Sequence, residues 1–169
     1  QQICYSDLGW DSPLPKNLED QWHAWLSSIQ GVSTLRLPRC IGFRQSRGEK
    51  IQLHVFCDAS EDGCGAVAYV RLNQGDDGNC CKFLMGKSRV VPRKITSLPR
   101  LELVAAVLAS KLKKYLVQEL REDIDRVFMW SDSMIVLHYL ANSNTRYKTF
   151  VANRIRVIKD YTNDCAWRH

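Results

Sequence analysis

Residues 51–72 read IQLHVFCDASEDGCGAVAYVRL, and this stretch decides the fold class. Every second residue from Ile51 to Cys57 is apolar, and the intervening series of residues ends with the carboxylate of Asp58. A period of two is typical of a strand that buries one face. The turn residues ASEDG lead directly into a second apolar run, CGAVAYVRL. The stretch therefore predicts two antiparallel strands joined by a tight turn.

Downstream of these two strands, the pattern indicates a third strand and then a long helix. The turn cluster NQGDDGN precedes the third strand, CCKFLMGKSRV. Thr96 or Ser97 can cap a helix with Pro99 in its first turn, and we expect this helix to continue to about Val117. Apolar residues at three- and four-residue spacing predict its buried stripe, which consists of Leu101, Ala105, Leu108, Leu112 and Tyr115.

The remaining sequence supplies the other half of the sheet. VFMW is a short continuous apolar run, which favours a central strand buried on both faces with Trp130 in the core. We expect a helix in MIVLHYL, a second helix at about residues 146–161 and a last strand beginning in CAWRH. The order β-β-β-α-β-α-α-β predicts an α/β fold, a mixed five-stranded sheet of three antiparallel and then parallel strands, with helices packed on it.

Residues 1–50 differ in character and are interpreted as a lead-in segment to a domain at residues 51–169. The proline-rich stretch DSPLP precedes a short helical pattern. Trp22 and Trp25 lie on its apolar face, and we expect this face to pack on a neighbour.

Composition and charge narrow the class of protein. Hydrophobic residues make up 45% of the chain, enough for a core, and no apolar run is long enough to cross a membrane. The seven cysteines contain no C-x-x-C pair, which favours reduced thiols over a zinc site. The net charge of +6 is uneven, since residues 82–169 hold 17 Lys and Arg against 8 Asp and Glu. A basic half indicates a polyanionic partner, although it is also compatible with a merely soluble surface.

Three carboxylates occupy positions where such a sheet builds a site. Asp58 ends the first strand, and Asp132 ends the strand formed by VFMW. A right-handed helical crossover makes these two strands neighbours, so their final carboxylates should lie side by side. Glu102, in the first turn of the intervening helix, can lean toward both.

A cluster of carboxylates points to a divalent cation. Carboxylates that lie close together repel one another unless a cation compensates their charge, and Mg²⁺ prefers carboxylate oxygens. Two such ions about 4 Å apart can activate water and stabilise a leaving oxygen in phosphodiester cleavage. The alternative is structural: the aspartates end strands, and Glu102 interacts with the helix dipole.

Four segments of the sequence now suggest a family. HVFCDASEDGCGAVAYVR, KSRVVPRKITSLPRLEL, VFMWSDSMIVLHYL and RYKTFVANRI occur in this order, and GWDSPLPKNLEDQWHAWL precedes them. The four segments together closely resemble the ribonuclease H-like region of BEL/Pao-type retrotransposon polyproteins. The stretch GWDSPLPKNLEDQWHAWL resembles the segment that joins the reverse transcriptase to that region.

The resemblance implies a ribonuclease H-like fold and an endonuclease that cuts the RNA strand of an RNA–DNA hybrid during reverse transcription. Its catalytic and metal-binding carboxylates would be Asp58, Glu102 and Asp132, with two Mg²⁺ ions, or Mn²⁺, in the complete site. The order Asp, Glu, Asp favours ribonuclease H over retroviral-type integrase, whose glutamate comes last. The implied partners are the reverse transcriptase and integrase regions of the same polyprotein, and the implied location is a cytoplasmic retrotransposon particle.

The resemblance also implies a fourth carboxylate. The family pattern continues past W-R-H to an aspartate in an Asn-Pro-Ala-Asp-like motif, whereas this sequence ends at His169. Asp160 and Asp164 are possible substitutes, but their helix and turn are expected to place them elsewhere. We therefore expect residues 1–169 alone to cleave hybrid RNA poorly. This leaves open a catalytically silent nucleic-acid-binding or structural module, or a domesticated host protein.

Basic residues near the predicted helix starts are candidates for binding phosphates. The alternative is a solvated basic surface. The candidates are Arg89, Arg93, Lys94, Arg100, Arg146 and Lys148.

Overall fold

Strand β1 (Ile51–Ala59) has the predicted alternation: in the computed structural model, Leu53, Val55 and Cys57 are buried and Phe56 and Asp58 are exposed. The other strands are β2 (Gly63–Asn73), β3 (Asn79–Val90), β4 (Arg126–Ser131) and β5 (Ala166–Arg168). The structure describes residues 8–38, 50–73, 79–91, 97–142 and 145–169, together with residues 3, 6 and 41.

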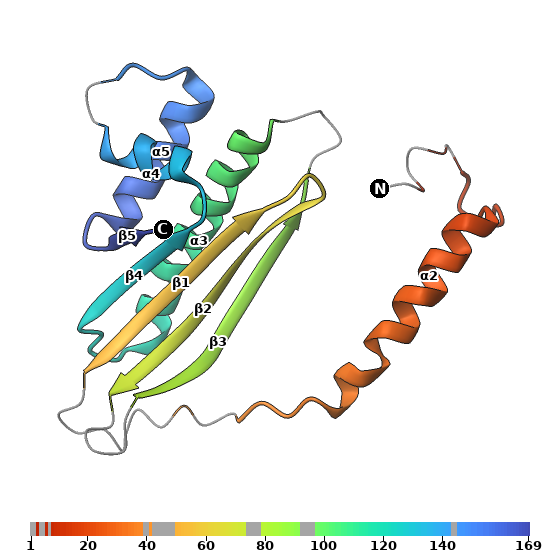
Figure 1. Ribbon diagram of the computed structural model, residues 1–169, viewed down its shortest axis with the longest axis horizontal. Coiled ribbons are helices and arrows are strands. Elements are labelled where there is room, and N and C mark those ends of the chain that lie inside the picture. The colour runs from red at the N-terminus through yellow and green to blue at the C-terminus, as the bar shows by residue number, and fades with distance from the viewer. Residues whose placement is uncertain are drawn as a thin grey trace. The chain divides into compact units, whose positions relative to one another are not determined.

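The sheet has the strand order β3-β2-β1-β4-β5, which confirms the predicted mixed topology (Figure 1). The pairs β1–β2 and β2–β3 are antiparallel, as expected for strands joined by short turns. Strand β4 returns parallel to β1 through a helical crossover, and β5 lies parallel to β4. The last helical connection thus ends in the short strand expected in CAWRH.

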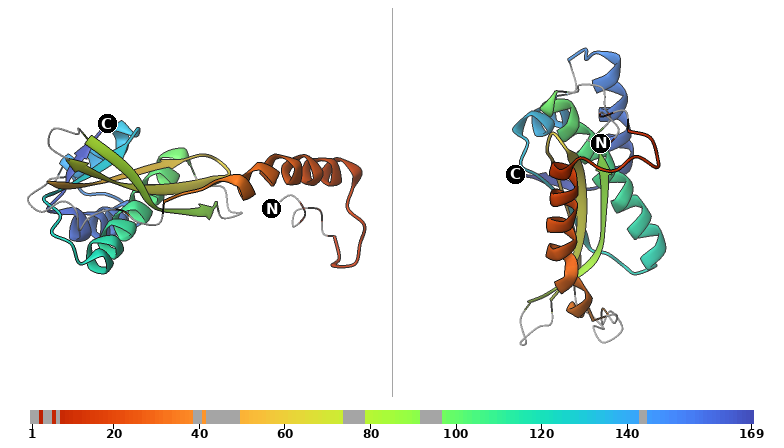
Figure 2. Two further views of the ribbon diagram at one scale, coloured as in Figure 1. Left: turned by 90° about the horizontal axis from the view of Figure 1, so that it is seen from below. Right: turned by 90° about the vertical axis from the view of Figure 1, so that its right-hand side faces the viewer.

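Helix α3 (Leu98–Leu120) covers one face of the sheet (Figure 2). Four residues of its predicted stripe, from Leu101 to Leu112, are buried against β1 and β2, while the predicted fifth residue, Tyr115, is 42% exposed. The prediction for Tyr115 was wrong because the buried stripe continues from Leu112 to Leu116, which leaves Tyr115 beside it. The Lys87 side chain on β3 lies over the Tyr115 ring, with Nζ 5.0 Å from the ring centroid. The helix extends three residues beyond Val117 to Leu120 and is followed by Arg121 at the C-cap, whose φ of 51° is left-handed.

Two further helices follow β4, namely α4 (Met134–Ala141) and α5 (Thr149–Thr162). Helix α5 packs beside α3 on the same side of the sheet and buries Ile155 and Ile158 (Figures 1 and 2). Their burial completes a single core between the sheet and these helices.

The opposite face of the sheet carries aromatic side chains from β1, β2, β3 and β4. Trp130 lies there and not in the predicted core: its ring stacks on Phe56 at 5.6 Å, and its indole N–H donates to His54 at 3.1 Å. The strand β4 is therefore buried on one face only, because Val127 and Met129 alternate with Phe128 and Trp130. Three rings of this face, those of Phe56, Tyr69 and Phe83, are between 36% and 42% exposed.

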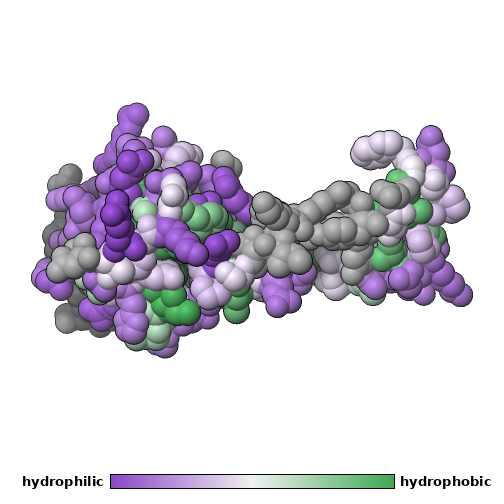
Figure 3. All heavy atoms as spheres, turned by 90° about the horizontal axis from the view of Figure 1, so that it is seen from above, coloured by the Kyte–Doolittle hydropathy of each residue, from purple (hydrophilic) through white to green (hydrophobic). Residues whose placement is uncertain are grey.

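The chain divides into two compact units, Gln1–Ile41 and Gly42–His169. The first contains α2 (Lys16–Ile29) and the 3-10 helix η1 (Gln30–Thr34). The predicted helix is present, but none of its residues is buried, and the stacked rings of Trp22 and Trp25 are each half-exposed. Its apolar side chains reach the surface, as the green atoms at the right of Figure 3 show.

Five of the seven cysteines lie in the described part of the chain. The five cysteines in the described part of the chain are all free thiols. Among the described helices, none has the length and apolar character that crossing a membrane requires.

Candidate active site

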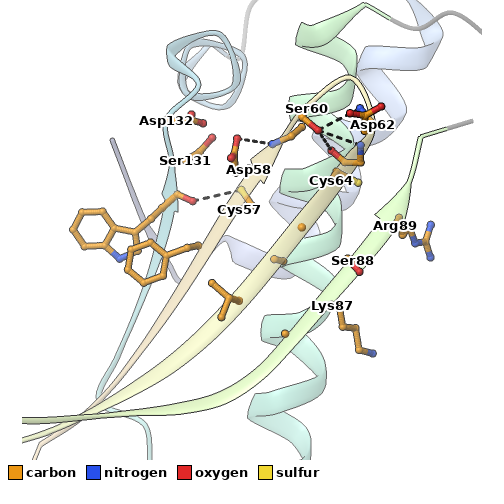
Figure 4. A pocket seen from close by; sticks show the side chains of 18 of the residues that line it. Cys57, Asp58, Ser60, Asp62, Cys64, Lys87, Ser88, Arg89, Ser131 and Asp132 are labelled. Atoms are coloured by element: carbon orange, nitrogen blue, oxygen red, sulfur yellow. Dashed lines mark hydrogen bonds between the residues drawn. The ribbon is translucent and has the colours of Figure 1, made fainter. Parts of the chain in front are cut away.

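Asp58 and Asp132 stand at the ends of neighbouring parallel strands. In the register of β1 and β4, Cys57 pairs with Ser131, so the next residue on each strand is an aspartate. Both aspartates are exposed, and their carboxylates lie near each other above the strand ends (Figure 4). The Asp58 carboxylate accepts a hydrogen bond of 2.6 Å from the backbone N–H of Ala59. The crossover topology thus brings together two of the three predicted carboxylates.

The charges of both aspartates affect the pKa of the Cys57 thiol. Burial, which is the largest cause, and the nearby carboxylates of Asp132 and Asp58 raise the pKa of this thiol to about 12. A hydrogen bond with Ser131 acts in the opposite direction. The Cys57 thiol therefore lies within the electrostatic field of both carboxylates.

Glu102 approaches this end of the sheet through a different residue. Because α3 begins at Leu98, Glu102 lies in its second turn and not in the predicted first turn. One oxygen of its carboxylate accepts a hydrogen bond of 2.5 Å from the hydroxyl of Ser133, the residue that follows Asp132. Helix α3 is thereby tied to the segment after β4.

A groove of about 1130 Å³ runs from the aspartates over the ends of β1, β2 and β3. Phe56, Val67 and Trp130 line its apolar part, and Asp58 and Asp132 line one end. Of the predicted phosphate-binding residues, Arg89 lines the same groove from β3, but its side chain extends away from the aspartates (Figure 4).

Carboxylate oxygens are the donors that Mg²⁺ prefers, so the residue types at this site fit a divalent ion. The spacing of these side chains fits a bound metal ion less well. Within the described parts of the chain, no group of three or more His, Cys, Asp or Glu side chains is arranged to hold a metal ion. The joint metal site of Asp58, Glu102 and Asp132 therefore stays a prediction, with Glu102 held by Ser133 as the chain stands.

A second hollow, of about 470 Å³, lies between the starts of α3 and α5. Three predicted phosphate-binding residues, Arg100, Arg146 and Lys148, line it together. In the described residues none of the three has a carboxylate within salt-bridge distance. The predicted residues Arg93 and Lys94 lie outside the described residues.

The cations beside this second hollow repel one another. Arg154 lies over the ring of Phe150 at 3.3 Å, and Arg100 lies over the same ring at 5.2 Å. Burial lowers the pKa of Arg154, and the charge of Arg100 lowers it further. Two guanidinium groups that share one ring without an anion form a surface that favours a phosphate.

The two substitute aspartates considered for the fourth carboxylate have different surroundings. Asp164 forms an ion pair of 2.8 Å with the ammonium group of Lys113 on α3, so its charge is already compensated. Asp160 is exposed on α5.

Sequence reasoning missed three polar residues around the aspartates. Ser131 and Ser133 are both 5% exposed, and the Ser131 hydroxyl accepts a hydrogen bond of 3.2 Å from the backbone N–H of Ser133. His169 lies with Nε2 3.0 Å from the carbonyl oxygen of Asp132. A serine directly before an apolar helix is a capping signal, and that signal could have drawn attention to Ser133.

The strand order and the aspartates at the strand ends define the domain as ribonuclease H-like in fold, as the resemblance predicted. A family described as the Pao retrotransposon-like RNaseH-like domain matches residues 1–133. The chain therefore belongs to the Pao retrotransposon-like RNaseH-like domain family.

Solved structures with a similar fold include RNase H1 of the archaeon Halobacterium salinarum NRC-1, at 13% identity and a TM-score of 0.42, covering 70% of this chain and 81% of that chain. LC11-RNase H1 in complex with an RNA/DNA hybrid has 14% identity and a TM-score of 0.45, with 71% and 84% covered. A foamy viral protease-reverse transcriptase in complex with dsDNA has 13% identity and a TM-score of 0.41, with 99% and 32% covered. A comparison with curated proteins finds no match.

Proposed function

We propose that this domain is a metal-dependent endonuclease that cleaves the RNA strand of RNA–DNA hybrids during retrotransposon reverse transcription. The observation that carries the proposal is the pairing of Asp58 and Asp132 at neighbouring parallel strand ends in a domain of the Pao RNaseH-like family. An acidic pair beside a groove is suited to metal-assisted phosphodiester hydrolysis.

Asp58 and Asp132 would hold the divalent ions, with Glu102 as the third carboxylate. Mg²⁺ is usually bound by one or two carboxylates together with substrate phosphates and water. Two aspartates side by side therefore suit an ion that binds together with the hybrid. When bound, the metal would activate the attacking water and stabilise the leaving oxygen. The role of the protein side chains is to bind and orient these ligands.

Hybrid binding would use the basic hollow between the starts of α3 and α5. Arg100, Arg146 and Lys148 have no described carboxylate partner, so their charges are available to phosphates. The N-termini of the two helices add a favourable field for anions. Arg89 lines the groove beside the aspartates and would contact a different part of the hybrid.

The family suggests the setting of this activity. We infer that the domain works beside the reverse transcriptase and integrase regions of one polyprotein, in a cytoplasmic retrotransposon particle. The match of a Pao retrotransposon-like domain to residues 1–133 supports this setting.

The test is cleavage of a labelled RNA–DNA hybrid in Mg²⁺ and in Mn²⁺. Because the resemblance predicts a fourth aspartate after His169, the assay uses this chain and a longer polyprotein segment. We expect weak cleavage by the chain and full cleavage by the longer segment. Asp58→Asn and Asp132→Asn should each abolish cleavage and leave hybrid binding largely intact. Asp123→Asn is the matched control, because this exposed aspartate lies before β4, at the end remote from Asp132.

The outcomes separate the two functions that we consider. RNA cleavage that depends on both aspartates and on the metal supports the nuclease. A longer segment that folds and binds hybrid but never cleaves would instead identify a silent nucleic-acid-binding or structural module.

A further inference from the structure

The hydroxyl of Ser133 makes two hydrogen bonds at once. It donates to Oε2 of Glu102 at 2.5 Å and accepts from the backbone N–H of Val136 at 3.3 Å. The second bond makes Ser133 the N-cap of α4. The residue is 5% exposed, so water has little access to replace either bond. One buried oxygen therefore joins the carboxylate on α3 to the start of α4.

The backbone around Ser133 is held in place as well. The Ser131 hydroxyl accepts the backbone N–H of Ser133 at 3.2 Å, and Ser131 is itself buried. On the other side, His169 Nε2 lies 3.0 Å from the Asp132 carbonyl oxygen. These two contacts restrict the backbone next to Asp132, and they thereby restrict the direction in which the Ser133 hydroxyl points.

Electrostatics explains why Glu102 needs such a partner. Its carboxylate is hydrogen-bonded to the residue that follows Asp132, at the end of the sheet where Asp58 also lies, and like charges repel. A hydroxyl donor offsets part of that repulsion and limits the rotation of the side chain. Hydrogen bonds of this kind orient carboxylates that bind metals, and losing one reduces metal affinity or activity by roughly 10–100-fold.

We propose that Ser133 is a positioning residue, whose hydroxyl sets the place and orientation of Glu102 relative to the two aspartates. This inference rests on the proposed nuclease function. It assigns to Ser133 a role distinct from capping α4, although one oxygen serves both.

Three substitutions separate the two roles. Ser133→Thr keeps a hydroxyl that can cap and donate. Ser133→Gly keeps a good N-cap, since glycine at this position costs helices little, but it cannot donate to Glu102. Ser133→Ala loses both functions. We expect Gly and Ala to lower kcat for hybrid cleavage in Mg²⁺ by about 10–100-fold with KM little changed, and Thr to retain most of the activity. Cleavage is measured in the longer polyprotein segment.

A readout independent of catalysis tests the contact itself. Urea unfolding of the metal-free chain is measured for Ser133→Gly, Glu102→Ala and the double variant. Non-additive effects on stability would show that the two side chains interact.

Additive effects, or a Ser133→Gly variant with normal kcat, would overturn the proposal and leave only capping. Suppose that the longer polyprotein segment never cleaves hybrid, with or without a substitution, while the effects of the two substitutions on stability remain non-additive. The proposed nuclease function then fails, and the contact between Ser133 and Glu102 stands.

Discussion

Replacing Asp164 by Asn tests how the last strand is attached to the rest of the domain. The Lys113 ammonium group is almost completely buried on α3, and it donates to the Asp164 carboxylate at 2.8 and 3.0 Å and to the Tyr161 carbonyl at 3.1 Å. These bonds link α3 to the end of α5 and the approach to β5. The substitution keeps the shape of the side chain and removes its charge.

The expected cost follows from the exposure of the two partners. A hydrogen bond to a charged group contributes about 1.5–3 kcal/mol, and breaking a fully buried pair costs about 3–5 kcal/mol. The Asp164 side chain is 60% exposed, so solvent screens its charge, whereas that of Lys113 is only 8% exposed. We therefore expect a loss of about 1–2 kcal/mol at pH 7. For a chain of this size, that loss lowers Tm by about 2–8 °C.

The pH dependence gives the sharper test. Burial alone would raise the pKa of Asp164, but hydrogen bonds from Lys113 and Cys165 outweigh it, and the pKa is lowered from 3.8. A lowered carboxyl pKa contributes stability that is complete above the unfolded-state pKa and is lost as the pH falls through the folded-state pKa. The gap in Tm between natural chain and variant should therefore be full at pH 7 and should close below about pH 3.8.

Thermal unfolding followed by circular dichroism measures this gap across the pH range. Asp160→Asn, at an exposed aspartate on α5, is the matched control and should leave Tm unchanged. A gap that is equally large in acid would refute the ion-pair argument. Because Asp164 is already paired with Lys113, its substitution should also leave hybrid cleavage unaffected below Tm. A loss of cleavage would make Asp164 a candidate metal ligand again.

Three further predictions follow from burial and charge. Because its pKa is raised to about 12, Cys57 should resist a thiol-specific reagent at pH 8 in the folded chain, whereas exposed Cys81 reacts; labelling of Cys57 at the rate of Cys81 would contradict its burial. Met129→Ala should destabilise by about 2–5 kcal/mol in urea unfolding, and Trp130→Ala by less, since only Met129 is fully buried; equal losses would place Trp130 in the core after all. Arg146→Glu should weaken hybrid binding and flatten its dependence on salt, as measured by fluorescence anisotropy, and an unchanged salt slope would exclude Arg146 from phosphate contacts.

Local periodicity was sufficient to predict most of the fold. The alternation in β1 and the spacing of Leu101 to Leu112 each reflect burial on one side of one element, which a sequence records directly. Two of the errors have a common cause. Trp130 and Tyr115 are large residues in apolar surroundings, yet other elements of the fold give them partners at the surface, namely Phe56 and Lys87.

The candidate site was predictable to the extent that it depends on strand ends. The pairing of Asp58 with Asp132 follows from the crossover topology, which the order of elements implies. The bond from Ser133 to Glu102 joins residues 31 positions apart, and the bonds from Lys113 to Asp164 join residues 51 apart. Such contacts depend on how α3 is rotated and placed over the sheet, and no local pattern encodes that placement.

The parallel pairing of β1 with β4 also has a kinetic consequence. The hairpins β1–β2 and β2–β3 join strands that are neighbours in sequence, whereas the contact of Ile51 with Asp125 closes a separation of 74 residues. Contacts between distant residues form late because the chain must first lose the entropy of a large loop. An intermediate that contains only the three antiparallel strands holds Asp58 without Asp132. During synthesis the acidic pair therefore assembles only after α3 has formed and β4 has joined the sheet, so a nascent chain passes through its first folding steps without a complete acidic site.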